Sequence, residues 1–227
     1  MPNDYLLDVC ERYPDLFVPC VSINPRRRDW SDELGRCAAR GARVLKIHPP
    51  TQDVDPADKR FKPFYRSCAT FGIIVMVHTG TEHSAEIVGH ETCDPARLAL
   101  ALDQGCTVIA AHSGMSNTFD REDFFPSLVE MIGRFENLYC DTAVLASMLR
   151  WRVISRLLDT PAVLERLLHA SDFPFPSNAL VFWNRLTSSK LRGLLVERNL
   201  IERDYRLKQA LGLPTEVFER ASKRLLA

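Results

Sequence analysis

Histidine and aspartate residues close short apolar runs at nearly constant intervals along this chain. His48, His78, His112, Asp141 and Asp172 are separated by 30, 34, 29 and 31 residues. Neutral imidazole and carboxylate are the ligands that zinc and similar divalent ions take in catalytic sites. Such an ion lowers the pKa of its bound water from ~15.7 to about 7, which generates hydroxide near neutral pH. The pattern therefore predicts metal-dependent chemistry centred on His78, His112 and Asp172, in which a histidine that is not a ligand acts as base.

Other polar residues fit known catalytic patterns less well. A single histidine at a strand end is more often a hydrogen-bonded structural residue, but several at successive strand ends weaken that alternative. The pair His90-Glu91 does not continue as HExxH, and Ser113 is not a nucleophile of the GxSxG type. We expect His83 and His90 on the surface and His169 against an outer helix.

The spacing also predicts the elements that position these residues. One βα unit occupies about 30 residues, so the intervals are those of successive parallel strands. Six apolar runs are candidates for the strands: 16–23, 43–48, 73–78, 107–112, 137–141 and 167–172. Helix starts are indicated at Asp55-Pro56 and Asp94-Pro95, and the residue period predicts further helices over 144–158 and 204–226.

Alternation along the strands predicts which residues share a face of the sheet. The expected sets are Val44, Lys46 and His48; Ile74, Met76 and His78; Val108, Ala110 and His112; and Leu168, Ala170 and Asp172. If these faces point into a (β/α) barrel, the polar members lie at its C-terminal rim, where barrel enzymes keep their active sites. A doubly wound open sheet is the alternative, but the chain has no Gly-rich phosphate turn after a strand.

Composition narrows the functional class. Lysine plus arginine equals aspartate plus glutamate at 29 each, so no basic surface for nucleic acid or anionic lipid is indicated. The seven cysteines include no CxxC pair, which is typical of a reducing compartment. Neither a membrane span nor a signal peptide is indicated. We expect a cytoplasmic protein whose partner is a small-molecule substrate, with neither a nucleic-acid nor a membrane partner.

Five motifs together resemble a known family. They are Lys46-Ile47-His48-Pro49, Val77-His78-Thr79-Gly80, Ala111-His112-Ser113-Gly114, Tyr139-Cys140-Asp141-Thr142 and Ala170-Ser171-Asp172-Phe173-Pro174. In order and spacing they resemble the amidohydrolase-related family, in the branch that includes aminocarboxymuconate semialdehyde decarboxylase. The resemblance implies a TIM (β/α) barrel, one divalent metal that is usually zinc, and a homodimer.

The resemblance also implies roles for individual residues. His78 and Asp172 correspond to metal ligands from the fifth and eighth strands, and His112, on the sixth, corresponds to the catalytic base or to a residue that positions the water. In a hydrolase, Asp172 is expected to hold the metal or to share in proton transfer. Lys46 and His48, on the fourth strand, are implied to line the site. Lys46 or Arg26, in the basic segment 26–28, is expected to hold a substrate carboxylate.

One feature departs from the family pattern. Members carry a His-x-His pair on the first strand that supplies two metal ligands, and no such pair occurs in the 227 residues. The first apolar run corresponds to the third strand of the family. We therefore expect residues 1–227 to form a single partial TIM-barrel domain with six of the eight βα units, lacking the first two strands.

Three functions are compatible with these residues. The first is a metal-dependent hydrolase that uses metal-activated water on a lactone, amide or ester. The second is a metal-dependent, non-oxidative decarboxylase of a small aromatic or enoic acid. The third is a catalytically inactive truncated barrel that acts as an assembly module through its open edge, an alternative that the missing ligand pair favours.

Overall fold

Six parallel strands form a single curved sheet in the computed structural model, which describes residues 1–83, 85–87 and 89–226. Each strand pairs with the next one in the chain, in the order β1-β2-β3-β4-β5-β6. The strands are β1 (Cys20–Val21), β2 (Val44–Ile47), β3 (Ile74–His78), β4 (Val108–Ala111), β5 (Leu138–Asp141) and β6 (Leu167–Leu168). All six lie within the predicted apolar runs, and the prediction of six βα units is confirmed.

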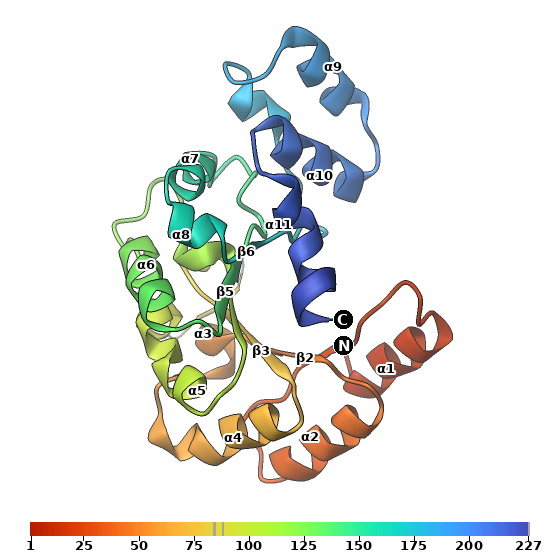
Figure 1. Cartoon of the computed structure of the whole chain (residues 1–227), viewed down its shortest axis with the longest axis vertical. Helices are drawn as coiled ribbons and strands as arrows, with labels where there is room; N and C mark the ends of the chain where they lie inside the picture. Colours follow the sequence, from red (N-terminus) through yellow and green to blue (C-terminus); the bar gives the residue numbers. More distant parts are fainter. Residues whose placement is uncertain (84, 88, 227) are drawn as a thin grey trace.

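Helices follow the strands along the outer side of the sheet, as Figure 1 shows for α2, α4, α5 and α6. The N-terminal and outer helices are α1 (Asn3–Arg12), α2 (Trp30–Ala39), α4 (Lys62–Thr70), α5 (Ala99–Asp103), α6 (Phe125–Arg134), α7 (Val153–Leu158) and α8 (Pro161–Leu164). Shorter turns lie in the connections: α3 (Pro49–Gln52), η1 (Lys59–Phe61), η2 (Glu91–Cys93), η3 (Pro95–Leu98), η4 (His112–Gly114) and η5 (Ala179–Phe182). This strand-then-helix alternation is the architecture of a TIM-type barrel.

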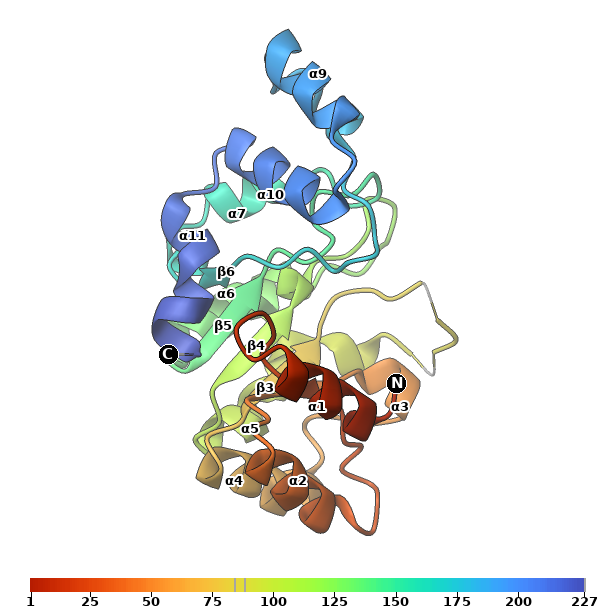
Figure 2. The ribbon, with the colours of Figure 1, turned by 90° about the vertical axis from the view of Figure 1, so that its right-hand side faces the viewer.

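The C-terminal segment folds differently from the preceding units. It contains α9 (Ser188–Val196), α10 (Leu200–Ala210), α11 (Thr215–Arg220) and the π-helical turn η6 (Ala221–Leu225). α9 stands away from the sheet in both views (Figures 1 and 2), whereas α11 packs against β6. Among the described residues, no helix combines the length and apolar character that crossing a bilayer requires.

Two apolar clusters lie on opposite faces of the sheet. The larger one lies between the sheet and the outer helices and includes Leu45, Val75 and Leu128. The smaller one is built from Val44, Ile74, Ile109 and Leu168 on the inner face. Ala221, Leu225 and Leu226 of the C-terminal segment pack on this inner cluster. In the described part of the chain, β1 and β6 are edge strands and these C-terminal residues cover part of the inner face.

The predicted faces are correct for β2 and β3 but wrong for β4. Ile109 belongs to the inner cluster, whereas Val108 and Ala110 pack with the outer helices. The register explains this placement, because Ile109 pairs with Met76, which packs on the inner cluster. Simple alternation would then direct His112 outward, but its φ of 66° turns the backbone into the left-handed region and ends the alternation there.

The outer strands are shorter than the apolar runs that predicted them. In the first run, Pro19 cannot donate a backbone hydrogen bond, and the ladder begins at Cys20. In the last run, the backbone pairing of β5 with β6 ends at Leu168, and side chains bind the backbone of Ala170 instead. Ala170 donates its N–H to Thr142 Oγ1 (3.1 Å), and its carbonyl accepts from Lys208 Nζ (2.8 Å). Asp172 therefore lies in a loop beyond β6, with a φ of 60°.

The predicted helix limits also need correction. Of the helix expected over 144–158, only α7 forms, because Val144 adopts a φ of 59° and turns occupy the residues up to Arg152. The helix expected over 204–226 is divided at Gly212 and Pro214. His169 behaves as predicted, since its Nε2 lies 3.3 Å from Asp204 Oδ2 on α10 and its ring contacts Phe218 on α11.

Candidate metal centre and active-site pocket

A pocket of about 510 Å³ opens at the C-terminal ends of the strands. We call it the rim pocket. It is lined by Lys46, His48, His78, Glu82, His83, His112, Asn117, Val144, Ser147, Met148, Leu149, Arg150, Asp172, Phe175 and Pro176. Five of the six residues predicted from the sequence as site residues therefore share one pocket, although they come from four different strand ends.

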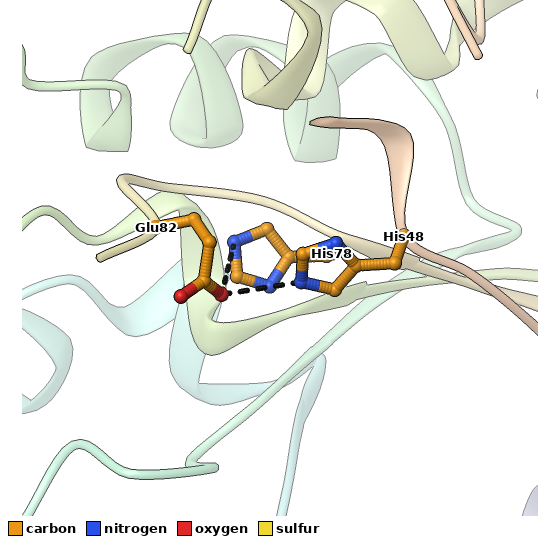
Figure 3. A group of neighbouring side chains, drawn as sticks. All are labelled: His48, His78 and Glu82. Atoms are coloured by element: carbon orange, nitrogen blue, oxygen red, sulfur yellow. Dashed lines mark hydrogen bonds and ion pairs between the residues drawn. The ribbon is translucent and has the colours of Figure 1, made fainter. Parts of the chain in front are cut away.

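Two histidines and a glutamate within the rim pocket could hold a metal ion. His48 follows β2, His78 ends β3, and Glu82 lies four residues further along the chain. One ligand atom from each lies within 4.8 Å of the other two. Both Nε2 atoms approach Glu82 Oε2, that of His48 at 3.1 Å and that of His78 at 3.7 Å (Figure 3). Two imidazoles and one carboxylate form a ligand set found in catalytic zinc sites.

The state of His78 fits a metal ligand. Its side chain is 2% exposed, and its Nε2 is buried without a hydrogen-bond partner among the described residues. Burial, together with the positive charge of Lys46 and the proximity of His48, lowers the pKa of His78 to about 2. The imidazole is therefore neutral at pH 7 and presents a lone pair rather than a second proton. An ion or a water bound at this nitrogen would satisfy it.

The backbone at His78 is held close to its neighbours. Gly80 has a φ of 85°, and a Cβ at this position would collide with the backbone of Met115. Thr79 Oγ1 donates to the Ala111 carbonyl (2.7 Å) and accepts from the N–H of Gly114 (2.9 Å). The His-Thr-Gly motif thus joins the ends of β3 and β4, which places His78 and His112 with ring centroids 4.7 Å apart.

His112 is oriented by the end of β5. Its backbone N–H donates to Asp141 Oδ1 (2.8 Å), which also accepts from the N–H of Ala143 (3.0 Å). Its Nδ1 lies 3.2 Å from the Ala143 carbonyl. A carbonyl can only accept, so Nδ1 carries the proton and Nε2 carries the lone pair. Burial and the charge of Lys46 hold the pKa of His112 well below its ordinary value.

Lys46 and Asp172 complete the charged lining of the rim pocket. Burial lowers the pKa of Lys46, which the carboxylates of Asp141 and Asp172 oppose. Burial raises the pKa of Asp172, which the charge of Lys46 opposes. Asp172 is not a member of the group of ligand atoms that lie within 4.8 Å of one another. The ligand pair His78–Asp172 and the roles of Lys46 and His48 in substrate binding remain predictions.

Arg26 lies outside the rim pocket. Its guanidinium forms an exposed ion pair with Asp53 and lines a separate, smaller cavity. The structure therefore does not bring it together with the other predicted site residues. His83, expected on the surface, is half exposed but borders the rim pocket, with Nε2 3.0 Å from both carboxylate oxygens of Asp120.

Two charged residues of the rim pocket were missed by the sequence analysis. Glu82 lies in an irregular segment after β3, and Arg150 lies in the turns between β5 and α7. Neither belongs to a periodic element, so no alternation places it in the site. The only available signal was that each follows a strand end within about ten residues, which is where barrel enzymes carry loop residues of the site.

The buried histidines predict a pH dependence of stability. His78 and His112 stay neutral in the folded chain, whereas in the unfolded chain they take up protons once the pH falls below about 6.5, the ordinary pKa of histidine. We expect the free energy of unfolding of chelator-treated protein to fall towards lower pH, with His78 contributing about 1 kcal/mol per pH unit. Urea unfolding at pH 7, 6 and 5 measures this slope. The raised pKa of Asp172 acts in the opposite direction, so the comparison is made between the wild type and His78→Asn. Equal slopes in the two proteins would contradict the prediction.

A model of the family described as amidohydrolase matches residues 1–181. No curated protein matches the chain. Among solved structures, an uncharacterised TIM-barrel protein from Bordetella bronchiseptica is 20% identical, with a TM-score of 0.63, over 93% of this chain and 73% of that chain.

Two further solved structures carry names that specify chemistry. A putative 2-pyrone-4,6-dicarboxylic acid hydrolase from Pseudomonas putida is 16% identical, with a TM-score of 0.62, over 96% of this chain and 72% of that chain. A 5-carboxyvanillate decarboxylase from Novosphingobium aromaticivorans, with bound manganese, is 15% identical, with a TM-score of 0.59, over 99% of this chain and 69% of that chain. Because these sequence identities are 20% or lower, the comparisons show that the chain shares the fold of these proteins and nothing about its substrate.

Proposed function

The chain belongs to the amidohydrolase family, and we propose that it is a metal-dependent hydrolase of a small carbonyl compound such as a lactone, an amide or an ester. The observation that carries this proposal is the group His48, His78 and Glu82 inside the rim pocket, in which one ligand atom of each residue lies within 4.8 Å of the others. We propose a divalent metal at this group, with zinc as the first candidate because two neutral imidazoles and a carboxylate suit it.

Each residue of the rim pocket has a separate role in the proposed hydrolysis. A divalent ion acts as a Lewis acid and supplies an activated water when it is bound. His112 is the base, because its Nδ1 proton is held by the Ala143 carbonyl and its Nε2 lone pair can accept a proton. Asp172 carries a raised pKa and so can take up and return a proton near the reacting group. Lys46 keeps its predicted substrate-binding role as part of this proposal, whereas His48 is assigned to the metal group and Arg26 lies outside the rim pocket.

Decarboxylation is the second candidate. The specific observation in its favour is the likeness in fold to the manganese-containing 5-carboxyvanillate decarboxylase. Both reactions use a metal and a proton-transferring residue. They differ in the bond that breaks, since hydrolysis consumes water and decarboxylation releases carbon dioxide.

A substrate panel tests the proposed reaction. The purified chain is assayed metal-free, zinc-loaded and manganese-loaded against lactones, esters, amides and small aromatic acids. We expect at least one lactone or ester to be opened only in a metal-loaded form, with kcat/KM falling more than about 100-fold on chelation and recovering on readdition of metal. The assay detects ring-opened product by chromatography and carbon dioxide by a coupled assay. Release of carbon dioxide without hydrolysis would favour the decarboxylase, and bound metal without any turnover would favour the inactive assembly module.

The cell compartment and the partners are also proposals. All seven cysteines are free thiols, and six of them are buried. This use of cysteine supports a reducing compartment, and we propose the cytoplasm. A small molecule is the proposed partner, because the rim pocket of about 510 Å³ has the size of a ligand site. We also propose a homodimer, for which the family resemblance is the only support.

A further inference from the structure

Arg150 has an unusual environment for an arginine. Its side chain is 6% exposed, although arginine is almost never fully buried unless it is paired. Nε donates to Asn117 Oδ1 (3.1 Å), and Nη2 donates to the Thr81 carbonyl (2.7 Å). Nη1 is buried and has no acceptor among the described residues. The guanidinium is thus held at two of its three nitrogens by neutral groups, and the third has no partner.

No carboxylate of the described residues forms an ion pair with this guanidinium. The carboxylates of Glu82, Asp172, Asp120 and Asp141 act on it electrostatically without forming an ion pair with it. A buried charge without a counterion is costly, and a buried donor without an acceptor adds to that cost. Both costs would be relieved by an anion that reaches Nη1 from the rim pocket, which Arg150 lines together with Lys46.

We propose that Arg150 is the anion-binding residue of the rim pocket and that it pairs with a carboxylate on the substrate. This inference deepens the proposed function and rests on it for the statement that the anion belongs to a substrate. The two fixed hydrogen bonds hold the guanidinium in one orientation, so a carboxylate bound at Nη1 is placed in a defined position relative to His48, His78 and Glu82. The substrate is therefore a carbonyl compound that carries a separate carboxylate.

The position of Arg150 explains why a carboxylate would matter for specificity. Thr81, whose carbonyl Arg150 holds, directly precedes Glu82 in the chain. Asn117, its other partner, lies in the segment after β4. Arg150 therefore links the segments after β3, β4 and β5 at the wall of the rim pocket. A neutral analogue would leave Nη1 without an acceptor, which is how a buried polar site rejects ligands that lack the matching group.

Binding measured without metal tests this inference separately from catalysis. The probes are aromatic and aliphatic monocarboxylates and dicarboxylates, each paired with its amide, and titrated by calorimetry into chelator-treated protein. Chelation removes direct metal–carboxylate contacts, so a preference for the acid reports on the cations of the rim pocket. We expect at least one acid to bind about 10- to 100-fold more tightly than its amide, since hydrogen bonds to charged groups are the strong ones.

Variants identify the cation responsible. Arg150→Met should abolish the preference for the acid and Arg150→Lys should retain part of it, whereas Arg152→Met, which changes an exposed arginine outside the rim pocket, should leave it unchanged. Inorganic phosphate is titrated alongside, and binding of phosphate but of no carboxylate would overturn the assignment to a substrate carboxylate. The proposal is also overturned if wild type does not prefer any acid over its amide, or if the preference survives in a folded Arg150→Met protein. These outcomes are measured by binding and do not depend on turnover. A failure of the anion-binding proposal can therefore be distinguished from a failure of the proposed hydrolase activity.

Discussion

Glu82→Gln should abolish stoichiometric metal binding. The substitution keeps the shape of the side chain but removes the negative charge that both Nε2 atoms of His48 and His78 approach. Even the outer partners of metal ligands are typically worth 10–100-fold in affinity, so loss of a direct ligand should cost more than about 100-fold. We expect close to one zinc per wild-type chain and a small fraction of that in the variant. Elemental analysis after zinc loading and dialysis measures the content, and competition with a chelator measures the affinity.

Two further variants make this result specific. Glu86→Gln removes an exposed carboxylate from the same segment and should leave the metal content unchanged. Asp172→Asn tests the ligand pair predicted from the sequence. Metal retained in Glu82→Gln but lost in Asp172→Asn would show that the pair His78–Asp172 holds the ion. Metal absent from every protein, including the wild type, would rule out a metal centre in this chain.

His112→Asn should reduce kcat by about 10²–10⁴-fold while metal content is retained. Asparagine tolerates the left-handed backbone at this position better than most residues, and its amide N–H can replace the hydrogen bond to the Ala143 carbonyl. The variant therefore removes the lone pair of Nε2 with little disturbance of the fold. The limb of the pH–rate profile that reports the base should disappear as well. Steady-state kinetics from pH 5 to 9, on the substrate that the panel identifies, measure both effects.

The matched control is His83→Asn, which removes a rim-pocket imidazole whose ring contacts His90 rather than His48, His78 or His112. His83 is half exposed and interacts with Asp120, so we expect less than a tenfold change in kcat. A pH–rate profile that His112→Asn leaves unchanged would exclude His112 as the base. Loss of metal in the same variant would instead point to a role for His112 in the metal centre.

Local periodicity was enough to predict most of the scaffold. A strand and its helix are each specified by nearby residues, and the intervals between His48, His78, His112 and Asp172 repeat with the length of one βα unit. Because all strands run in the same direction, the residues that end them gather at one rim whatever the details of the packing. That rule brought Lys46, His48, His78, His112 and Asp172 into one pocket.

The tertiary structure decided which side chains meet within the rim pocket. The face of β4 depends on its register with β3, and His112 reaches the pocket only because its backbone turns at a positive φ. Glu82 and Arg150 lie in irregular segments, where no period relates position in the chain to direction in space. Their places are set by contacts with residues distant in the sequence, such as the hydrogen bond from Arg150 to the Thr81 carbonyl, 69 residues away. The residue types present at the rim could therefore be predicted from the sequence, whereas the proximity of His48, His78 and Glu82 and the burial of Arg150 are properties of the folded chain.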